Sequence, residues 1–338
     1  MRKLLNTVYV TNEQAYLSLD GENLVCRMED SEKFRIPFDN LESVVCFCYL
    51  GCSPALMGKC AEKLIPISFI SPSGRFLAKV TGETRGNVFL RVAQIDVFRE
   101  KALILAQNTI AAKLANTLGL IRRSRHDNPE LRKDGDISRV IEFLKRGVDA
   151  IYKADSLDTV LGVEGNCAKQ YFSIFDRLMT NPEFTFTARS KRPPLDPVNA
   201  VLSFVYTLYT NEFASALETV GLDSYIGFYH ALRSGRSSLA CDLMEEARCI
   251  AERFTLTVFN LGMLSAQDFA RQPSGAVWLN DDGRKKVLTR WQEKKRTELT
   301  HPYLGQKIQL GLLPYIQSNL LAKFVRGDIP EYPCYLSR

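Results

Sequence analysis

The sequence predicts an α+β protein in which a small β-rich N-terminal domain precedes a larger all-α domain. Near the N-terminus, short runs of β-branched and aromatic residues alternate with Asn, Asp, Gly and Ser turns, as in a sheet of short strands. From residue 87 onward, apolar residues recur at every third or fourth position, which is typical of amphipathic helices. These patterns place the two domains at residues 1–83 and 84–338.

The N-terminal domain is expected to contain several short strands and one helix. The first strands are expected in the runs TVYV, AYLSLDG, NLVCRM, KFRIPF and SVVCFCY. Asp20 and Gly21 separate two alternating runs and predict a hairpin. Ser53 is a suitable N-cap for the helix ALMGKCAEK, and Pro54 fits its first position. The runs LIPISFI and RFLAKV, separated by SPSG, then predict one more strand pair.

The second domain is expected to be almost entirely helical. The expected helices are NVFLRVAQIDVFREKALILAQNTIAAKLANTLGLIRR, ISRVIEFLKRGVDAIYKA, SLDTVLGVEGNCAKQYFSIFDRLM, PVNAVLSFVYTLYTNEFASALETV, SLACDLMEEARCIAERFTLTVFNLG and GRKKVLTRWQEKKRTEL. The one clear β segment in this half is the short AVWLNDDGR, and the Pro-rich segment RSKRPPLDP interrupts the helices near the middle.

Composition excludes several classes of protein. Hydrophobic residues make up 46% and charged residues 24% of the 338 residues, as in ordinary globular proteins. Nine cysteines without a CxxC pair argue against a disulfide framework and a four-thiolate zinc site. The N-terminus does not resemble a signal peptide, and no apolar run is long enough to span a bilayer. We therefore expect a cytoplasmic protein without a membrane partner.

The segment YIGFYHALRSGRSSLACDLMEEARC places a histidine, His230, before a cluster of acidic residues. In a helix starting near residue 238, Asp242, Glu245 and Glu246 share one face. Carboxylates one turn apart suit a hard cation such as Mg²⁺ or Mn²⁺. Acidic stripes on amphipathic helices are more often solvated faces, so this segment alone favours a solvated face. Spacing alone does not choose between Glu245 and Glu246.

Glu164 lies between Gly162 and Gly165 inside a strongly helical pattern. Glycine in a helix interior costs about 1 kcal/mol relative to alanine. Two such glycines indicate either a tight crossing with another backbone or access for a bulky ligand beside the glutamate.

Basic residues occur in groups, and the net charge of +6 permits a polyanionic partner without requiring one. Arg189, Lys191 and Arg192 form one such group, and Arg233 and Arg236 lie just after His230. Groups of this kind can hold phosphates.

The ordered motifs of this chain resemble those of the CRISPR-associated spacer-acquisition integrases. The resemblance covers most of the length and rests on SPSGRFLAKVTGETRGNVFLRVAQ, GVEGNCAKQYF, RPPLDPVNAVLSFVYTLY, YIGFYHALRSGRSSLACDLMEE and GAVWLNDDGRKKVL. It implies a β-rich domain that dimerises, at residues 1–83, and a helical catalytic and DNA-binding domain, at residues 84–338. The implied activity is a metal-dependent endonuclease and integrase that joins 3′-hydroxyl ends of spacer DNA into the repeat array by transesterification.

The resemblance also implies site residues, a cofactor and partners. Its metal ligands correspond to Glu164, His230, Asp242 and Glu245, where the family often has aspartate in place of Glu245, and the cofactor is Mg²⁺ or Mn²⁺. Asn199 is expected to support the site, whereas His126 and His301 are expected at the surface. Expected DNA contacts, from the basic groups above and the domain junction, are Arg85, Arg91, Arg189, Lys191, Arg192, Arg233 and Arg236. The implied partners are double-stranded DNA, a second copy of the chain and a small ferredoxin-like protein of CRISPR adaptation.

Three alternatives remain open from the sequence. A structure-selective nuclease acting on branched DNA would need the same metal site. A non-catalytic DNA-binding scaffold would be favoured by the loss of a ligand position, and a small-molecule metalloenzyme is disfavoured by the basic groups.

The C-terminal segment GDIPEYPCYLSR is either a docking segment for a partner or a tail packed on its own domain.

Overall fold

The computed structural model describes residues 6–29, 31–71, 76–82 and 88–337. The observed class is α+β, with a strand-rich N-terminal part and a mostly helical remainder, which confirms the predicted class. The chain divides into two compact units: Met1–Arg85 with Leu264–Thr297, and Gly86–Met263 with Glu298–Arg338. The sequence boundary assigned Leu264–Thr297 to the helical domain, whereas these residues group with the N-terminal strands.

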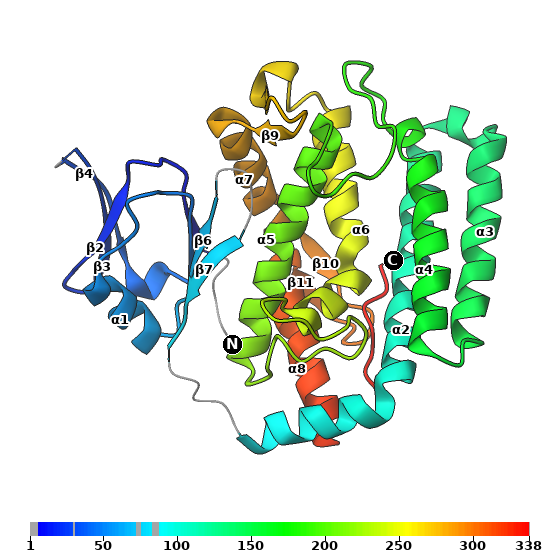
Figure 1. The fold of residues 1–338 in the computed structure, drawn as a ribbon, viewed down its shortest axis with the longest axis horizontal. Coiled ribbons are helices and arrows are strands. Elements are labelled where there is room, and N and C mark those ends of the chain that lie inside the picture. The colour runs from blue at the N-terminus through cyan, green and yellow to red at the C-terminus, as the bar shows by residue number, and fades with distance from the viewer. Residues whose placement is uncertain (1–5, 30, 72–75, 83–87, 338) are drawn as a thin grey trace. The chain divides into compact units, whose positions relative to one another are not determined.

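The first unit contains two N-terminal sheets and one short helix (Figure 1). One sheet has the order β1-β5-β6-β7, parallel except for the antiparallel β6–β7 pair, and the other is the antiparallel meander β2-β3-β4. The bounds are β1 Thr7–Val10, β2 Tyr16–Asp20, β3 Asn23–Met28, β4 Ser31–Pro37, β5 Ser43–Cys46, α1 Pro54–Glu62, β6 Ile67–Ile70 and β7 Phe76–Val80, with a 3₁₀ turn at Phe38–Asn40. The expected turn SPSG falls mostly outside the described residues.

Local sequence signals in this unit act as expected. Asp20 pairs with Asn23 across the β2–β3 hairpin, and Gly21 adopts a φ of +55° in the turn. The Ser53 hydroxyl accepts a hydrogen bond from the Leu56 N–H at 3.2 Å and caps α1. All nine cysteines lie in described segments, and none of them forms a disulfide there.

The segment Leu264–Thr297 adds a hairpin and a helix to the first unit. These are β8 Phe269–Arg271 and β9 Val277–Leu279, an antiparallel pair, and α7 Asp281–Lys295, with a 3₁₀ turn at Ala266–Asp268. The Gln292 amide donates to the Thr7 carbonyl at 3.1 Å, and the Lys295 ammonium lies 6.0 Å from the centre of the Tyr9 ring. These contacts with β1 explain why the segment belongs to this unit.

The second unit is a helical assembly organised around one long helix, α2. Its elements are α2 Val88–Asp127, α3 Gly135–Tyr152, α4 Leu157–Ser173, α5 Pro197–Thr219, α6 Ser238–Asn260 and α8 Leu313–Arg326, with β10 Glu298–Thr300 paired to β11 Lys307–Gln309 and 3₁₀ turns at Pro129–Arg132, Asp176–Leu178 and Leu310–Leu312. Helix α2 packs against α3, α4, α6 and α8, and α5 lies beside α6 (Figure 1). No helix among the described residues is both long and apolar enough to cross a membrane.

The sequence analysis missed several elements of this half. It did not predict helix α8 or strands β8, β10 and β11, and it extended the α4 helix to residue 179, whereas α4 ends at Ser173. Signals for α8 are present, since Pro314 lies in its first turn and Gly327 follows it with a φ of +80°. The three strands have three residues each, too short for an alternating pattern to stand out.

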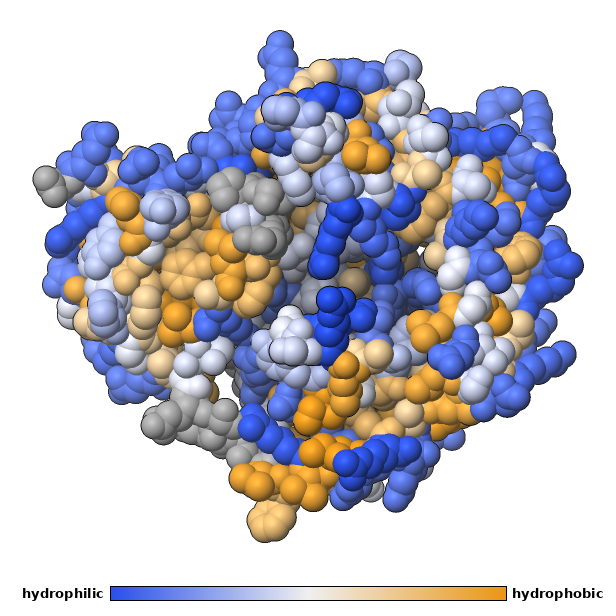
Figure 2. Space-filling view, viewed as in Figure 1, coloured by the Kyte–Doolittle hydropathy of each residue, from blue (hydrophilic) through white to orange (hydrophobic). Residues whose placement is uncertain are grey.

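Apolar side chains are exposed at the N-terminal end of α2. Val88, Phe89 and Val92 are all more than half exposed. Figure 2 shows hydrophobic residues gathered over this end of the helix. Such a gathering is typical of surfaces that contact another molecule.

The closest helix crossing near α4 involves a glycine of α3. A Cβ added to Gly147 would lie 2.5 Å from Sγ of Cys167 on α4 and 3.3 Å from Cδ1 of Leu114 on α2. A Cβ on Gly162 or Gly165 would meet nothing within 4 Å. Gly162 and Gly165 therefore do not serve a tight helix crossing.

We expect Gly147→Ala to lower the free energy of unfolding by about 1–3 kcal/mol, because the added methyl overpacks the α3–α4 contact. Gly162→Ala is the matched control and should raise the same quantity by about 0.5–1 kcal/mol, since alanine suits a helix interior and has open space here. Urea unfolding followed by circular dichroism measures both changes. Equal stability of Gly147→Ala and the wild type would contradict the overpacking argument.

Candidate active site

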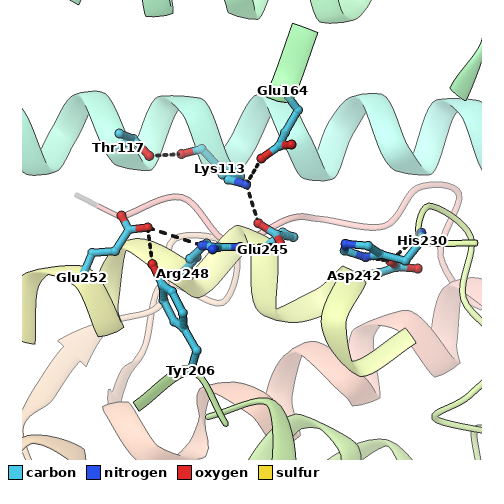
Figure 3. A network of polar contacts seen from close by, with 9 residues as sticks. All are labelled: Lys113, Thr117, Glu164, Tyr206, His230, Asp242, Glu245, Arg248 and Glu252. Carbon is cyan, nitrogen blue, oxygen red and sulfur yellow. Dashed lines mark hydrogen bonds and ion pairs between the residues drawn. The ribbon is translucent and has the colours of Figure 1, made fainter. Parts of the chain in front are cut away.

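Polar side chains from four segments of the second unit converge at one place (Figure 3). Helix α4 supplies Glu164, the loop before α6 supplies His230, and α6 supplies Asp242 and Glu245. Helix α2 contributes Lys113, which the sequence analysis did not single out. The structure thus brings together all four residues that the resemblance implied as metal ligands.

The Asp242 carboxylate organises the loop that carries His230. Its Oδ2 accepts hydrogen bonds from the backbone N–H groups of Phe228 and Tyr229 at 2.8 and 3.0 Å. Its Oδ1 accepts from the backbone N–H of His230 at 2.9 Å and lies 2.6 Å from Nδ1 of the same ring. A carboxylate has about four acceptor positions, and these four contacts use them. Asp242 therefore fixes the loop and orients the imidazole.

Two further residues hold the same loop in place. The buried Gln94 amide on α2 donates to the carbonyls of Asp223 and Ile226, both at 2.9 Å, and accepts from the Asp223 N–H at 2.9 Å. A Cβ on Gly227 would lie 2.5 Å from Oδ2 of Asp242 and 2.9 Å from the backbone carbon of Ser238. The loop thus needs glycine at 227, and neither contact has a sequence signal that spacing could reveal.

Glu245 lies between two cations. Its Oε1 accepts from Arg248 at 2.7 Å, and its Oε2 lies 2.6 Å from Nζ of Lys113. Burial alone would raise the pKa of Glu245, but Arg248 and Lys113 together lower it well below the ordinary value. Glu245 is therefore an ionised carboxylate inside the protein.

Lys113 bridges the two glutamates. Its ammonium pairs with Oε1 of Glu164 as well as with Glu245, and only 9% of its side chain is exposed (Figure 3). Burial lowers the pKa of Lys113, but the two carboxylates outweigh burial and raise the pKa above its ordinary value. The position of Lys113 is set by glutamates on two other helices and not by a local motif. The sequence therefore did not reveal that Lys113 belongs to the site.

Arg248 is held from its other side. Its guanidinium lies 4.4 Å from the centre of the Tyr206 ring, and its Nε is 3.4 Å from Oε1 of Glu252. The Tyr206 hydroxyl donates to the same Glu252 oxygen at 2.8 Å. Arg189 lies 5.4 Å from the Tyr206 ring centre and donates to Oδ1 of Asn199 at 2.6 Å. Asn199 thus helps to position Arg189, which lies with Arg248 against the Tyr206 ring beside the site.

The acidic stripe of α6 is not a solvated face. Asp242 and Glu246 are fully buried and Glu245 is 5% exposed, so the solvated-face interpretation of this segment is wrong. Glu246 points into a network of its own. Its Oε1 accepts from Gln317 at 2.8 Å and from the Tyr332 hydroxyl at 2.5 Å, and its Oε2 accepts from the Tyr335 N–H at 2.8 Å. Geometry therefore separates Glu245, in the site, from Glu246, which binds the tail.

The C-terminal tail packs on its own unit. Tyr332 and Tyr335 are buried, and Asn116 on α2 donates to the Tyr335 carbonyl at 2.9 Å. His301 is also fully buried, with Nε2 2.9 Å from Oε1 of Gln317, so its expected surface position is wrong. His126 is exposed, as expected. The packed-tail alternative is the one that the structure supports.

The expected DNA contacts differ in their surroundings. Arg233, Lys191 and Arg192 are exposed, whereas Arg189 and Arg236 are partly buried near the site. Arg91 is partly buried in the first turns of α2. Arg85 lies outside the described residues.

The chemistry of the donor set suits a hard divalent cation, although no group of three His, Cys, Asp or Glu within the described ranges is arranged as a formed metal cluster. The ammonium of Lys113 marks a cation position between the Glu164 and Glu245 carboxylates. The Nδ1 atom of His230 faces Asp242. The other ring nitrogen, Nε2, has no hydrogen-bond partner in the described part of the chain. Two carboxylates and one imidazole oriented by a carboxylate are donor types that divalent-cation sites use.

Comparison with known proteins points to one family. The family described as "CRISPR associated protein Cas1" matches residues 8–293. The chain is 41% identical over 344 residues to "CRISPR-associated endonuclease Cas1 1" of Chlorobaculum tepidum, covering 100% of both chains. It is 43% identical over 340 residues to "CRISPR-associated endonuclease Cas1 2" of Rhodospirillum rubrum, covering 98% of each.

Solved structures share the fold at lower identity. A casposase bound to integration product matches with a TM-score of 0.85 at 19% identity, covering 97% of this chain and 92% of that chain. A Cas6-RT-Cas1–Cas2 complex matches with a TM-score of 0.83 at 20% identity, covering 98% and 36%. A CAS1 protein from Thermotoga maritima matches with a TM-score of 0.82 at 21% identity, covering 98% and 100%.

We expect Gly227→Ala to displace the His230 loop, because the added methyl would collide with the Asp242 carboxylate. The free energy of unfolding should fall by about 1–3 kcal/mol. Thermal unfolding of this variant, with Gly165→Ala as a control that meets open space, measures the change. Unfolding of Gly227→Ala at the wild-type midpoint would contradict the tight fit.

Glu246→Ala should loosen the tail, because three donors from Gln317, Tyr332 and the Tyr335 backbone lose their acceptor. Leaving such groups unpaired should lower the free energy of unfolding by about 1–3 kcal/mol. Hydrogen exchange of the C-terminal peptide should become faster, whereas Glu142→Ala, at an exposed glutamate, should leave it unchanged. Unaltered protection of that peptide in Glu246→Ala would show that other contacts hold the tail.

Proposed function

The chain belongs to the CRISPR-associated Cas1 family, and we propose that it is a metal-dependent DNA integrase and endonuclease of CRISPR adaptation. In this proposal it joins the 3′-hydroxyl ends of new spacer DNA into the repeat array by transesterification. The observation that carries the proposal is the cation position between the partly buried carboxylate of Glu164 and the buried carboxylate of Glu245, next to an imidazole whose orientation is fixed.

We assign different roles to the four implied ligands. Glu164, Glu245 and Nε2 of His230 hold the Mg²⁺ or Mn²⁺ ion, and Asp242 positions His230 through its Nδ1. The sequence analysis counted Asp242 among the ligands, but its oxygens already accept hydrogen bonds from the loop. A bound ion would supply electrostatic stabilisation of the charge that develops on the reacting phosphate.

The protein's own residues then bind and orient DNA. The 3′-hydroxyl of the incoming DNA is the nucleophile in strand transfer, so the proposal needs no nucleophilic side chain. Exposed Arg233, three residues after His230, and exposed Lys191, in the segment before α5, contact phosphates and make binding sensitive to salt. Arg248 stays beside Glu245 because Tyr206 and Glu252 hold it from the other side.

The partners in the proposal are double-stranded DNA, a second copy of the chain and a small ferredoxin-like adaptation protein. One solved structure with the same fold is a Cas6-RT-Cas1–Cas2 complex. The exposed apolar side chains of Val88, Phe89 and Val92 support the proposal of a further protein contact on the second unit.

A structure-selective nuclease acting on branched DNA is the second candidate function. The names of the two sequence relatives, both called endonucleases, support DNA cleavage as an activity. It would use the same residues with water in place of the 3′-hydroxyl. A non-catalytic scaffold is disfavoured, because a residue able to bind a metal is present at every ligand position that the resemblance implied.

Strand transfer of a short 3′-hydroxyl duplex into a supercoiled plasmid carrying a repeat tests the proposal. The assay contains Mn²⁺, Mg²⁺ or EDTA, with and without the small partner protein. His230→Ala and Glu164→Ala should each reduce joining by at least about a hundredfold, since even residues that only orient metal ligands contribute about 10- to 100-fold.

Two control variants remove a histidine and a glutamate side chain at exposed positions away from the site. His126→Ala and Glu142→Ala should join DNA as the wild type does. Joining in EDTA, or joining that survives both site substitutions, would refute the metal-dependent site. Cleavage without joining in the presence of the partner would favour the branched-DNA nuclease.

A further inference from the structure

Lys113 occupies the place between two carboxylates where a cation is needed. Its ammonium contacts Glu164 from α4 and Glu245 from α6, so one positive charge faces two negative charges (Figure 3). The side chains of Lys113, Glu164 and Glu245 are 9%, 20% and 6% exposed. Water screens such a buried group poorly, so the two carboxylates would repel each other strongly without a cation between them.

The two cations around Glu245 are held differently. Arg248 is anchored by the Tyr206 ring and by Glu252 in addition to Glu245. In the described structure, the ammonium of Lys113 has Glu164 and Glu245 as its partners, both of them proposed metal ligands. Its ammonium is carried on a flexible four-carbon stem. Lys113 is therefore the cation of the pair with fewer contacts outside the proposed ligands.

We propose that Lys113 is an internal counter-ion that keeps Glu164 and Glu245 together in the metal-free protein and is displaced when a divalent cation binds. This inference rests on the proposed function, since it takes both glutamates as metal ligands. A divalent ion on Oε2 of Glu245 and an ammonium on the same oxygen would lie within a few ångströms of each other and repel. Metal binding then requires the ammonium to move away.

Lys113 thus has opposite effects on stability and on metal affinity. It stabilises the metal-free fold, because it neutralises Glu164 and, together with Arg248, the buried Glu245. It weakens metal binding, because the ion must first displace it. A purely structural lysine would not show the second effect, since its loss would leave metal affinity unchanged or lower it.

The experiment compares the full-length wild type with Lys113→Met, which keeps the length of the stem and removes the charge. Lys145→Met is the matched control at a lysine on α3 that pairs with Glu142 near the surface. Mn²⁺ affinity is measured from the electron paramagnetic resonance signal of free Mn²⁺ and by calorimetry. Thermal unfolding is followed in EDTA and in saturating Mn²⁺.

We expect Lys113→Met to bind Mn²⁺ about tenfold more tightly than the wild type, a change within the range found for groups next to metal ligands. Its unfolding midpoint should be lower than that of the wild type in EDTA, and saturating Mn²⁺ should close most of this gap. Lys145→Met should match the wild type in affinity. Equal or weaker Mn²⁺ binding by Lys113→Met would overturn the inference.

Lys113→Arg gives an independent test should Lys113→Met fail to fold. The permanently charged guanidinium can bind a carboxylate through two N–H groups and is harder to displace. This variant should keep wild-type stability in EDTA and bind Mn²⁺ more weakly than the wild type. Equal or tighter binding would overturn the inference.

The wild type and His230→Ala separate this inference from the proposed function. Wild-type Mn²⁺ binding that His230→Ala abolishes supports the metal site, and the Lys113 variants then decide the role of the lysine. Failure of the wild type to bind Mn²⁺ would refute the metal site itself, and with it the inference.

Discussion

The structure depends on the partners that the buried carboxyl groups of helix α6 find in other parts of the chain. An ionised carboxylate inside a protein requires cations or N–H donors, and leaving one unpaired costs several kcal/mol. Asp242 pairs with the backbone and ring of the His230 loop, and Glu245 pairs with Lys113 and Arg248. Glu246 accepts hydrogen bonds from Gln317 and the tail. Glu252 contacts Tyr206 and Arg248. Each requirement ties a different segment to α6, so the same interactions that stabilise the fold also assemble the site.

This arrangement explains how a site can be accurate although it is drawn from distant parts of the chain. His230 lies on a loop, yet its backbone is held by Asp242, and the start of the same loop is held by Gln94. The ring cannot turn without losing a contact of 2.6 Å to a buried carboxylate. A loop residue fixed in this way can present one nitrogen in a constant direction, which metal binding needs.

Local chemistry was readable from the sequence, whereas long-range pairing was not. Alternation, the Asp20–Gly21 turn and the Ser53 cap identified the N-terminal elements because each acts within a few residues. His301 and Lys113 had no comparable local signal. The burial of His301 follows from Gln317 on α8, a helix that the sequence analysis had not predicted, and the position of Lys113 follows from glutamates on two other helices. The acidic stripe was misjudged for the same reason, since its partners lie elsewhere in the chain.

Residue type and spacing also could not assign roles within the acidic stripe. Asp242, Glu245 and Glu246 are all buried carboxylates on one helix, and each could bind a metal by its chemistry alone. The partners of their oxygens separate them. The Asp242 oxygens accept hydrogen bonds from backbone N–H groups that fix the His230 loop. The Glu246 oxygens accept hydrogen bonds from donors that hold the tail. Glu245 alone of the three faces a cation whose contacts are all with the proposed ligands, so it is the carboxylate of α6 that can exchange its partner for a metal ion without unfastening a segment of the chain.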